Sequence, residues 1–193
     1  MAKKRKPKQP STSQPPPTTN LPSTVSPILP YLYLSPASAT SPKSTPSLLQ
    51  NGITTVFSIG KSPLFLHPEI TYHRLPLLDS ENVSIIPTVE KACEIIDNVE
   101  KQGKKVLVHC SAGISRSPAV IAGYLIRRKG MTLEGAMDVI KGGRGVVRPN
   151  KGFMEELEEM EKGGVVDGDD SKAEKGEGEE ESGDGNNAKA ITK

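Results

Sequence analysis

Cys110 and Arg116 are the two residues of this sequence with the clearest capacity for chemistry, because they stand six positions apart between two apolar segments. Residues 106–108 before them are typical of a buried strand, and residues 119–126 after them are typical of a buried helix. Amide N–H groups at the start of a helix converge on an anion, and the helix dipole adds partial positive charge there. The spacing therefore predicts a phosphate-binding loop that contains a thiol and a guanidinium.

Each residue type in this loop suits the binding or attack of a phosphate group. A thiol at a helix N-terminus beside a guanidinium has its pKa lowered to roughly 3.5–7.5, so we expect Cys110 to be a thiolate nucleophile. Gly113 permits backbone angles and close packing that a Cβ would prevent. Arg116 presents a planar fork that matches two oxygens of a phosphoryl group. These residue types together predict phosphoryl transfer to sulfur.

The segment His-Cys-Ser-Ala-Gly-Ile-Ser-Arg-Ser-Pro, residues 109–118, resembles the signature H-C-x5-R of the Cys-based protein tyrosine phosphatase superfamily, and its later part resembles the dual-specificity branch. The resemblance extends from about residue 28 to residue 161 and is to the small, atypical type without a docking domain. It implies an α/β fold of three layers, in which a central, mostly parallel sheet of about four to five strands is flanked by helices.

The same resemblance implies the roles of most site residues. Asp79, 31 positions before Cys110, is expected to protonate the leaving oxygen as general acid. Glu81 is the alternative acid on the same segment, and a structural interpretation makes Asp79 the cap of a turn. Ser117 is expected to donate a hydrogen bond to the sulfur. The phosphate is expected to be held by Arg116 and by the backbone of Ser111, Ala112, Gly113, Ile114 and Ser115.

Four other residues have expected roles around the loop. His109 is expected to orient the loop through ring hydrogen bonds and not to act as a base. Asn150, in the segment Pro-Asn-Lys-Gly-Phe, matches a family element that braces the domain and caps its last helix. Arg144 and Arg148 are open to two interpretations: contact with a second phosphate or with acidic flanks of a substrate, or a solvated or structural role.

The pattern of apolar residues predicts a compact α/β unit. Strands are expected at residues 31–34, 54–59, 72–75 and 105–109. Helices are expected at residues 47–51, 88–101, 118–128, 133–141 and 151–161. Thr132 is a suitable N-cap for the fourth helix, and Gly130 is a suitable stop for the third. Residues 35–46, rich in Ser and Pro, are expected to form an irregular loop.

The composition predicts one domain between two tails. Only 34% of the 193 residues are hydrophobic, and the deficit lies at the ends of the chain. Residues 1–27 are basic and then rich in Pro, Ser and Thr, so we expect a disordered tail there. Residues 163–193 carry nine acidic residues against four lysines and are expected to form a disordered acidic tail. The catalytic domain is therefore expected at residues 28–162.

The substrate is expected to be a phosphoprotein, dephosphorylated on tyrosine and on serine or threonine through a phosphocysteine intermediate. The loop residues between Cys110 and Arg116 include no lysine that could meet the extra phosphates of an inositol lipid. Two alternatives stay open. One is a phosphatase of non-protein substrates, namely a phosphoinositide, a phosphoglucan or an RNA 5′-phosphate. The other is a phospho-binding scaffold with little turnover.

Location and partners are inferred from charge and hydropathy. Residues 3–8, from Lys3 to Lys8, resemble a nuclear-import signal that an import receptor would bind, so we expect a protein of the nucleus, the cytoplasm or both. The sequence has no apolar run near 18 residues, and we expect no membrane span. We expect no nucleic-acid partner and a monomer, although the sequence leaves the oligomeric state open.

Cofactor and redox chemistry are inferred from the histidines and cysteines. Three scattered histidines offer no cluster at metal-ligand spacing, so we expect neither a metal ion nor another cofactor. Cys93 falls on the apolar face of a predicted helix, which favours core packing. Its alternative role is a resolving thiol for oxidised Cys110.

Overall fold

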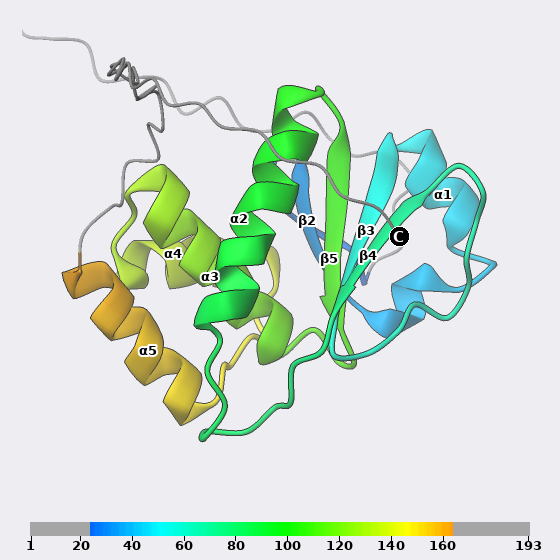
Figure 1. Cartoon of the computed structure of the whole chain (residues 1–193). Helices are drawn as coiled ribbons and strands as arrows, with labels where there is room; N and C mark the ends of the chain where they lie inside the picture. Colours follow the sequence, from blue (N-terminus) through cyan, green and yellow to red (C-terminus); the bar gives the residue numbers. More distant parts are fainter. Residues whose placement is uncertain (1–23, 164–193) are drawn as a thin grey trace, which may run out of the picture.

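The computed structural model of the protein describes residues 24–163 (Figure 1). Its strands are β1 (Ser26–Leu29), β2 (Leu32–Pro36), β3 (Ile53–Ile59), β4 (Thr71–Leu75) and β5 (Lys105–Cys110). Its helices are the 3₁₀ helix η1 (Ala37–Thr40), α1 (Thr45–Gln50), α2 (Ile86–Lys101), α3 (Arg116–Lys129), α4 (Leu133–Gly143) and α5 (Lys151–Lys162). No helix within this part of the chain is long and apolar enough to cross a membrane.

The strands form one five-stranded sheet in the order β1-β2-β5-β3-β4. β2, β5, β3 and β4 run parallel, and β1 pairs with β2 in the antiparallel direction. Helices α2 to α5 lie on one face of the sheet and α1 lies on the other (Figure 1). The expected fold class, a three-layer α/β domain with a mostly parallel sheet, is therefore confirmed.

The central strand β5 is buried on both faces of the sheet, as the apolar run in its sequence predicts. Val106 and Val108 pack in the larger core with α2 to α5, and Leu107 packs in the smaller core with α1. Helix α3 follows β5 directly and is buried continuously from Ser117 to Ile126. It packs against β5, α2, α4 and α5. The loop between β5 and α3 thus lies between two buried elements at the carboxyl edge of the sheet.

Most predicted elements are confirmed, with ends that differ by at most two residues. Thr132 caps α4, since its Oγ1 accepts a hydrogen bond from Gly135 N at 3.1 Å. Gly130 ends α3 with φ of 62°. The expectation of an irregular loop over residues 35–46 is wrong in part, because η1 and the start of α1 lie there.

The first strand begins before residue 28, the expected start of the catalytic domain. Strand β1 begins at Ser26, and the side chains of Val25 and Ser26 are buried. Pro27 obscured this strand in the sequence, but Pro is accepted here because β1 is an edge strand and Pro27 is exposed. Residues 1–23 and 164–193, which include Lys3 to Lys8 and nearly all of the acidic segment, lie outside the described residues.

Candidate active site

Cys110 is the last residue of β5, and its side chain is only 2% exposed. Its Sγ accepts hydrogen bonds from Gly113 N and from Ser117 Oγ, each at 3.2 Å. Burial raises the pKa of Cys110, but the Ser117 hydroxyl and the backbone N–H groups of Ser117, Gly113 and Ile114 outweigh it and lower the pKa below its ordinary value. The site therefore favours a thiolate at position 110.

The loop after Cys110 turns its carbonyl oxygens outward. Four consecutive carbonyls accept hydrogen bonds from outside the loop, at distances of 2.8 to 3.1 Å. Backbone N–H groups of Ala37 and Arg148 donate to Ser111 O and Ile114 O. The Arg144 guanidinium donates to the two carbonyls between them, Ala112 O through Nη2 and Gly113 O through Nε. In a trans peptide the following N–H points opposite to the carbonyl. The N–H groups of residues 112–115 therefore face inward, which makes an anion-binding cradle.

Gly113 is required at its position for two reasons. Its φ of 65° is in the left-handed region, which residues with a side chain rarely adopt. A Cβ there would also lie 2.8 Å from the carbonyl of Ser35 and 2.9 Å from Pro36 N at the end of β2. The loop is thus packed directly on the neighbouring strand.

Arg116, the first residue of α3, lies across the loop. Its Nη2 donates to Ser111 Oγ at 2.8 Å and its Nη1 donates to Leu77 O at 3.2 Å. Its buried Nε has no hydrogen-bond partner among the described residues and lies 3.7 Å from Asp79 Oδ2. A Cβ on Gly60, whose φ is 72°, would overlap Arg116 Nη1, so Gly60 leaves the space that the guanidinium occupies.

Asp79 is brought to the same loop from the segment after β4. Its Oδ1 accepts hydrogen bonds from Ser115 Oγ at 2.6 Å and from Asn150 Nδ2 at 2.9 Å. Glu81 is exposed, and its side chain has no hydrogen-bond or ion-pair partner within residues 24–163. The backbone of Glu81 packs on α5, since a Cβ on Gly152 would overlap Glu81 O. Asp79, and not Glu81, is therefore the carboxylate that contacts the loop.

Asn150 links the site to α5. Its Oδ1 accepts from Phe153 N at 3.0 Å, which caps the helix, and its N–H donates to Ser115 Oγ at 3.2 Å. Together with the bond to Asp79, these contacts hold the acid segment and the loop on one helix terminus. Arg144 has the structural role described above, since three backbone carbonyls, those of Thr24, Ala112 and Gly113, accept its N–H groups.

His109 is completely buried in β5. Its Nε2 lies 2.8 Å from Ser58 Oγ on β3, and its Nδ1 lies 3.3 Å from Cys110 O. Burial lowers the pKa of His109, and the Cys110 carbonyl offsets this in part, so the ring is neutral near pH 7. These contacts fix the end of β5. Sequence reasoning missed Ser58, Gly60 and Ala37, which have no local pattern around them.

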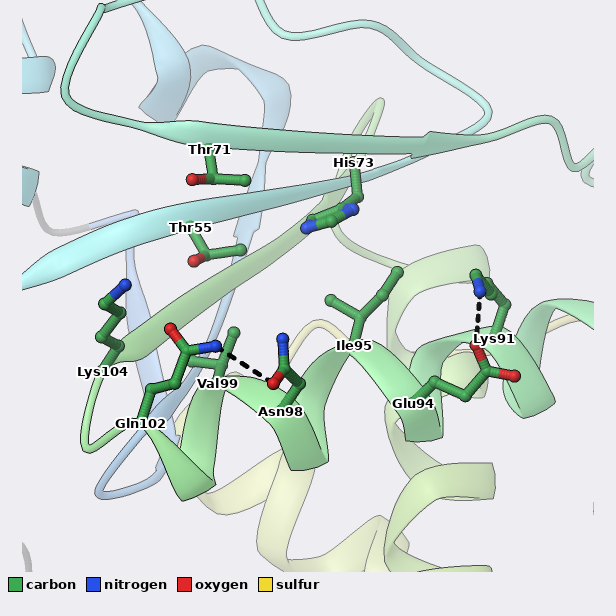
Figure 2. A pocket seen from close by; sticks show the side chains of 10 residues that line it. All are labelled: Thr55, Thr71, His73, Lys91, Glu94, Ile95, Asn98, Val99, Gln102 and Lys104. Atoms are coloured by element: carbon green, nitrogen blue, oxygen red, sulfur yellow. Dashed lines mark hydrogen bonds and ion pairs between the residues drawn. The ribbon is translucent and has the colours of Figure 1, made fainter.

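A cavity away from this site is larger than the space beside Arg116. It has a volume of about 550 Å³ and lies between β4 and α2, where His73, Lys91, Asn98 and Lys104 line it (Figure 2). None of the expected site residues lines it. Cavity size therefore does not identify the site here, whereas the convergence of hydrogen-bond donors on one thiol does.

A thiol of lowered pKa, in a loop whose amides face inward at the carboxyl edge of a mostly parallel sheet, is the arrangement expected for phosphatases that use a cysteine. The family described as "Dual specificity phosphatase, catalytic domain" matches residues 32–163, and the chain belongs to this family.

Relatives and solved structures agree with this assignment. Mouse "Dual specificity protein phosphatase 2" is 38% identical over 135 residues, which are 69% of this chain and 42% of that protein. The structure of the human tyrosine phosphatase-like serine/threonine/tyrosine-interacting protein is 33% identical with a TM-score of 0.68, covering 72% of this chain and 95% of that one. A mouse putative dual specificity phosphatase complexed with zinc tungstate is 28% identical with a TM-score of 0.69, covering 80% and 94%. The chain thus spans about two fifths of the length of the curated mouse relative.

Proposed function

We propose that this protein hydrolyses phosphate monoesters of tyrosine and of serine or threonine in other proteins, through a phosphocysteine intermediate. The observation that carries the proposal is the Cys110 sulfur, whose pKa is lowered by donors of the loop that also forms the amide cradle. Membership of the dual specificity phosphatase family supports the same chemistry. The tungstate complex of the mouse structure adds that a related chain forms a complex with a tetrahedral oxyanion.

In the first step, the Cys110 thiolate attacks phosphorus and forms an S–P bond. The bond between phosphorus and the ester oxygen breaks, and Asp79 donates its proton to that oxygen, which leaves as the alcohol of the substrate. Arg116 and the inward N–H groups stabilise the charge on the three other oxygens. Binding of the phosphate releases the Arg116 donors from Ser111 Oγ for this purpose.

In the second step, the Asp79 carboxylate accepts a proton from a water molecule, which attacks the phosphorus of phosphocysteine. The S–P bond breaks, the thiolate is restored and inorganic phosphate leaves. Ser117 Oγ, a donor to the sulfur at 3.2 Å, stabilises the departing thiolate. Asn150 and Ser115 act as positioning residues for Asp79 in both steps.

The surface around the loop supports a protein substrate. Leu78, Ile114 and Val146, which come from three separate segments, are 72%, 36% and 59% exposed. No basic side chain lies in the loop between Cys110 and Arg116. Exposed apolar side chains on segments that contact the loop fit the side chains that flank a phosphoresidue better than they fit a polyphosphorylated headgroup.

The cellular location follows from the basic N-terminal segment. We infer that an import receptor binds the segment from Lys3 to Lys8 and that the protein works in the nucleus and the cytoplasm. Fluorescent fusions of the full chain and of a chain without residues 1–10 test this. A nuclear fraction that is the same in both chains would contradict the inference.

The test of the activity uses p-nitrophenyl phosphate and peptides with phosphotyrosine or phosphothreonine. We expect release of phosphate in the presence of a chelator, and inhibition by vanadate. Cys110→Ser should lower kcat at least about 10⁴-fold and keep the affinity for phosphopeptide, because the loop is intact without its nucleophile. Cys93→Ala is the control and should keep kcat. Asp79→Asn should lower kcat more for phosphothreonine than for the aryl phosphate, because the threonine alkoxide is the poorer leaving group and needs the proton more. Glu81→Gln should leave kcat for both substrates unchanged.

Two outcomes would favour the alternatives. Binding of phosphopeptide by the wild type with no release of phosphate would make the protein a phospho-binding scaffold. A kcat/KM that is higher for a phosphoinositide, a phosphoglucan or an RNA 5′-phosphate than for any phosphopeptide would assign a non-protein substrate.

A further inference from the structure

A second cavity opens beside Arg116, at the carboxyl end of β4. It has a volume of about 410 Å³. Arg116 belongs to both spaces, since its Nη2 donates to the phosphate loop at Ser111 and its side chain lines this cavity. Gly60 forms part of the cavity wall next to Arg116. A group bound here would therefore lie next to a phosphate held in the loop.

Arg74 on β4 is the second arginine of this cavity. It is exposed, and its guanidinium makes no hydrogen bond or ion pair with any residue from 24 to 163. By contrast, Arg128 is held by Asp97 and Arg144 by backbone carbonyls. Arg74 is thus a guanidinium that is available to a ligand.

The lining of the cavity is basic and apolar. Its lining combines the guanidinium groups of Arg74 and Arg116 with an apolar surface, and among the described residues that line it none is acidic. The apolar part is formed by Pro76, Leu77, Leu78 and Val83. Such a lining favours an anionic group carried on a short aliphatic stem, since the stem contacts the apolar wall and the charge meets Arg74.

We propose that this cavity is a subsite for a second anionic group of the substrate, a carboxylate or a phosphate near the phosphoresidue that Cys110 attacks, and that Arg74 is its specificity-determining residue. The inference rests on the proposed phosphatase function for its meaning. It does not rest on turnover for its test, because binding to the subsite is measurable without hydrolysis.

The test measures the affinity of Cys110→Ser protein for phosphotyrosine peptides by calorimetry. One peptide set has alanine at the three positions on each side of the phosphotyrosine, and others place a single Asp, Glu or phosphoserine at each position in turn. We expect one position at which an acidic group raises affinity about tenfold over alanine. Arg74→Ala in the same protein should reduce that ratio to about one, and Arg74→Lys should leave an intermediate ratio.

Lys104→Ala is the matched control, because it removes one positive charge from an exposed side chain at the opposite end of the sheet (Figure 2). The acidic-to-alanine ratio should stay near tenfold in this variant. An equal fall in Arg74→Ala and Lys104→Ala, or no fall in either, would overturn the subsite. Comparison of carboxylate with phosphoserine at the selected position identifies which anion the cavity takes.

Turnover separates this inference from the proposed function. In proteins that keep Cys110, the ratio of acidic to alanine peptide is measured with kcat/KM in place of affinity. Both peptides are tested on the same variant, so a general loss of activity leaves this ratio unchanged. If the wild type hydrolyses no substrate, the phosphatase proposal fails while the binding ratio still decides on the subsite. If it hydrolyses all peptides alike and Arg74→Ala changes no ratio, only the subsite fails.

Discussion

The two cysteines of this chain are both buried, at 2% exposure for Cys110 and 1% for Cys93, yet their environments act in opposite directions. Cys93 lies within α2 among apolar side chains, and burial raises its pKa to about 11, with smaller effects from Arg128 and Asp97. Cys110 lies at a strand end among hydrogen-bond donors, and its pKa is lowered in spite of burial. Burial alone therefore makes a thiol inert, and oriented donors make it reactive.

This difference also bears on the redox role considered for Cys93. A resolving thiol attacks as a thiolate. A pKa of about 11 keeps Cys93 protonated near pH 7. Its environment therefore favours core packing over reaction with an oxidised Cys110.

Among substitutions of the residues that support Cys110, the largest expected effect comes from Gly113→Ala, which disturbs the loop that gives Cys110 its donors. A Cβ would meet the backbone of Ser35 and Pro36, and φ of 65° would be strained. We expect kcat to fall about 10²- to 10³-fold, as for the loss of an oxyanion donor. The matched control is Gly142→Ala in α4, where a Cβ meets no atom within 4 Å. Wild-type kinetics in Gly113→Ala would mean that the amide cradle is not needed.

The next effect is expected from Arg144→Met, which removes the donors to Ala112 O and Gly113 O. Without them the loop amides lose their inward orientation, so we expect kcat to fall about tenfold to a hundredfold. Arg128→Met removes the ion pair with Asp97 near the other thiol and is the comparison. It should change the free energy of unfolding by only about 0–1 kcal/mol and leave kcat unaltered. Equal effects of the two variants on kcat would refute the supporting role of Arg144.

A smaller effect is expected from Ser117→Ala, which removes one donor to the Cys110 sulfur. The thiolate loses a stabilising hydrogen bond while the thiol loses little, so the pKa of Cys110 should rise by about one unit. The rate of alkylation by iodoacetamide, followed against pH in a Cys93→Ala background, reports this value directly. An unchanged midpoint would assign the lowered pKa to the backbone N–H groups alone.

The last expected effect is on stability and not on activity: the free energy of unfolding depends on pH, and the two thiols contribute to this dependence with opposite signs. The lowered pKa of Cys110 stabilises the folded state above an unfolded value of about 8.5, and this stabilisation is lost as the pH falls through the folded pKa. The raised pKa of Cys93 stabilises the folded state below about 8.5, and this is lost as the pH rises toward 11.

Urea unfolding between pH 6.5 and 10.5 tests these signs. Cys93→Ala should remove an alkaline loss of about 2.5 kcal/mol at pH 10.5. Cys110→Ala should flatten the increase in the free energy of unfolding that ends near pH 8.5. Both variants are compared with the wild type, so that other titrating groups cancel. Identical slopes in the three proteins would contradict the opposite environments.

The sequence was most informative where the site is local in the chain. Residues 109–118 carry the nucleophile, the loop and the start of α3 in one segment, so spacing alone placed them. The parallel strand β5 was recognisable because burial on both faces demands a continuous apolar run.

The sequence was least informative where a residue acts across the fold. The pairing of β5 with its neighbours β2 and β3 brings three such residues to the site: Ala37 after β2, and Ser58 and Gly60 at the end of β3. No local pattern encodes such pairing. Strand β1 was missed for a related reason, since Pro27 breaks the alternation that marks a strand. The sequence left the role of Arg144 open because its acceptors in the loop are backbone carbonyls 31 and 32 residues away.

The hydrogen bond from Arg144 Nη1 to Thr24 O at 3.4 Å joins residues 120 positions apart. With the contacts of Asn150 from α5, it means that the loop is secured by the first and the last described parts of the domain. During synthesis, Cys110 is made before Arg144 and Asn150, so the loop precedes the side chains that support it. The oriented donors around the Cys110 sulfur are therefore expected only once the C-terminal helices of the domain have packed against the sheet.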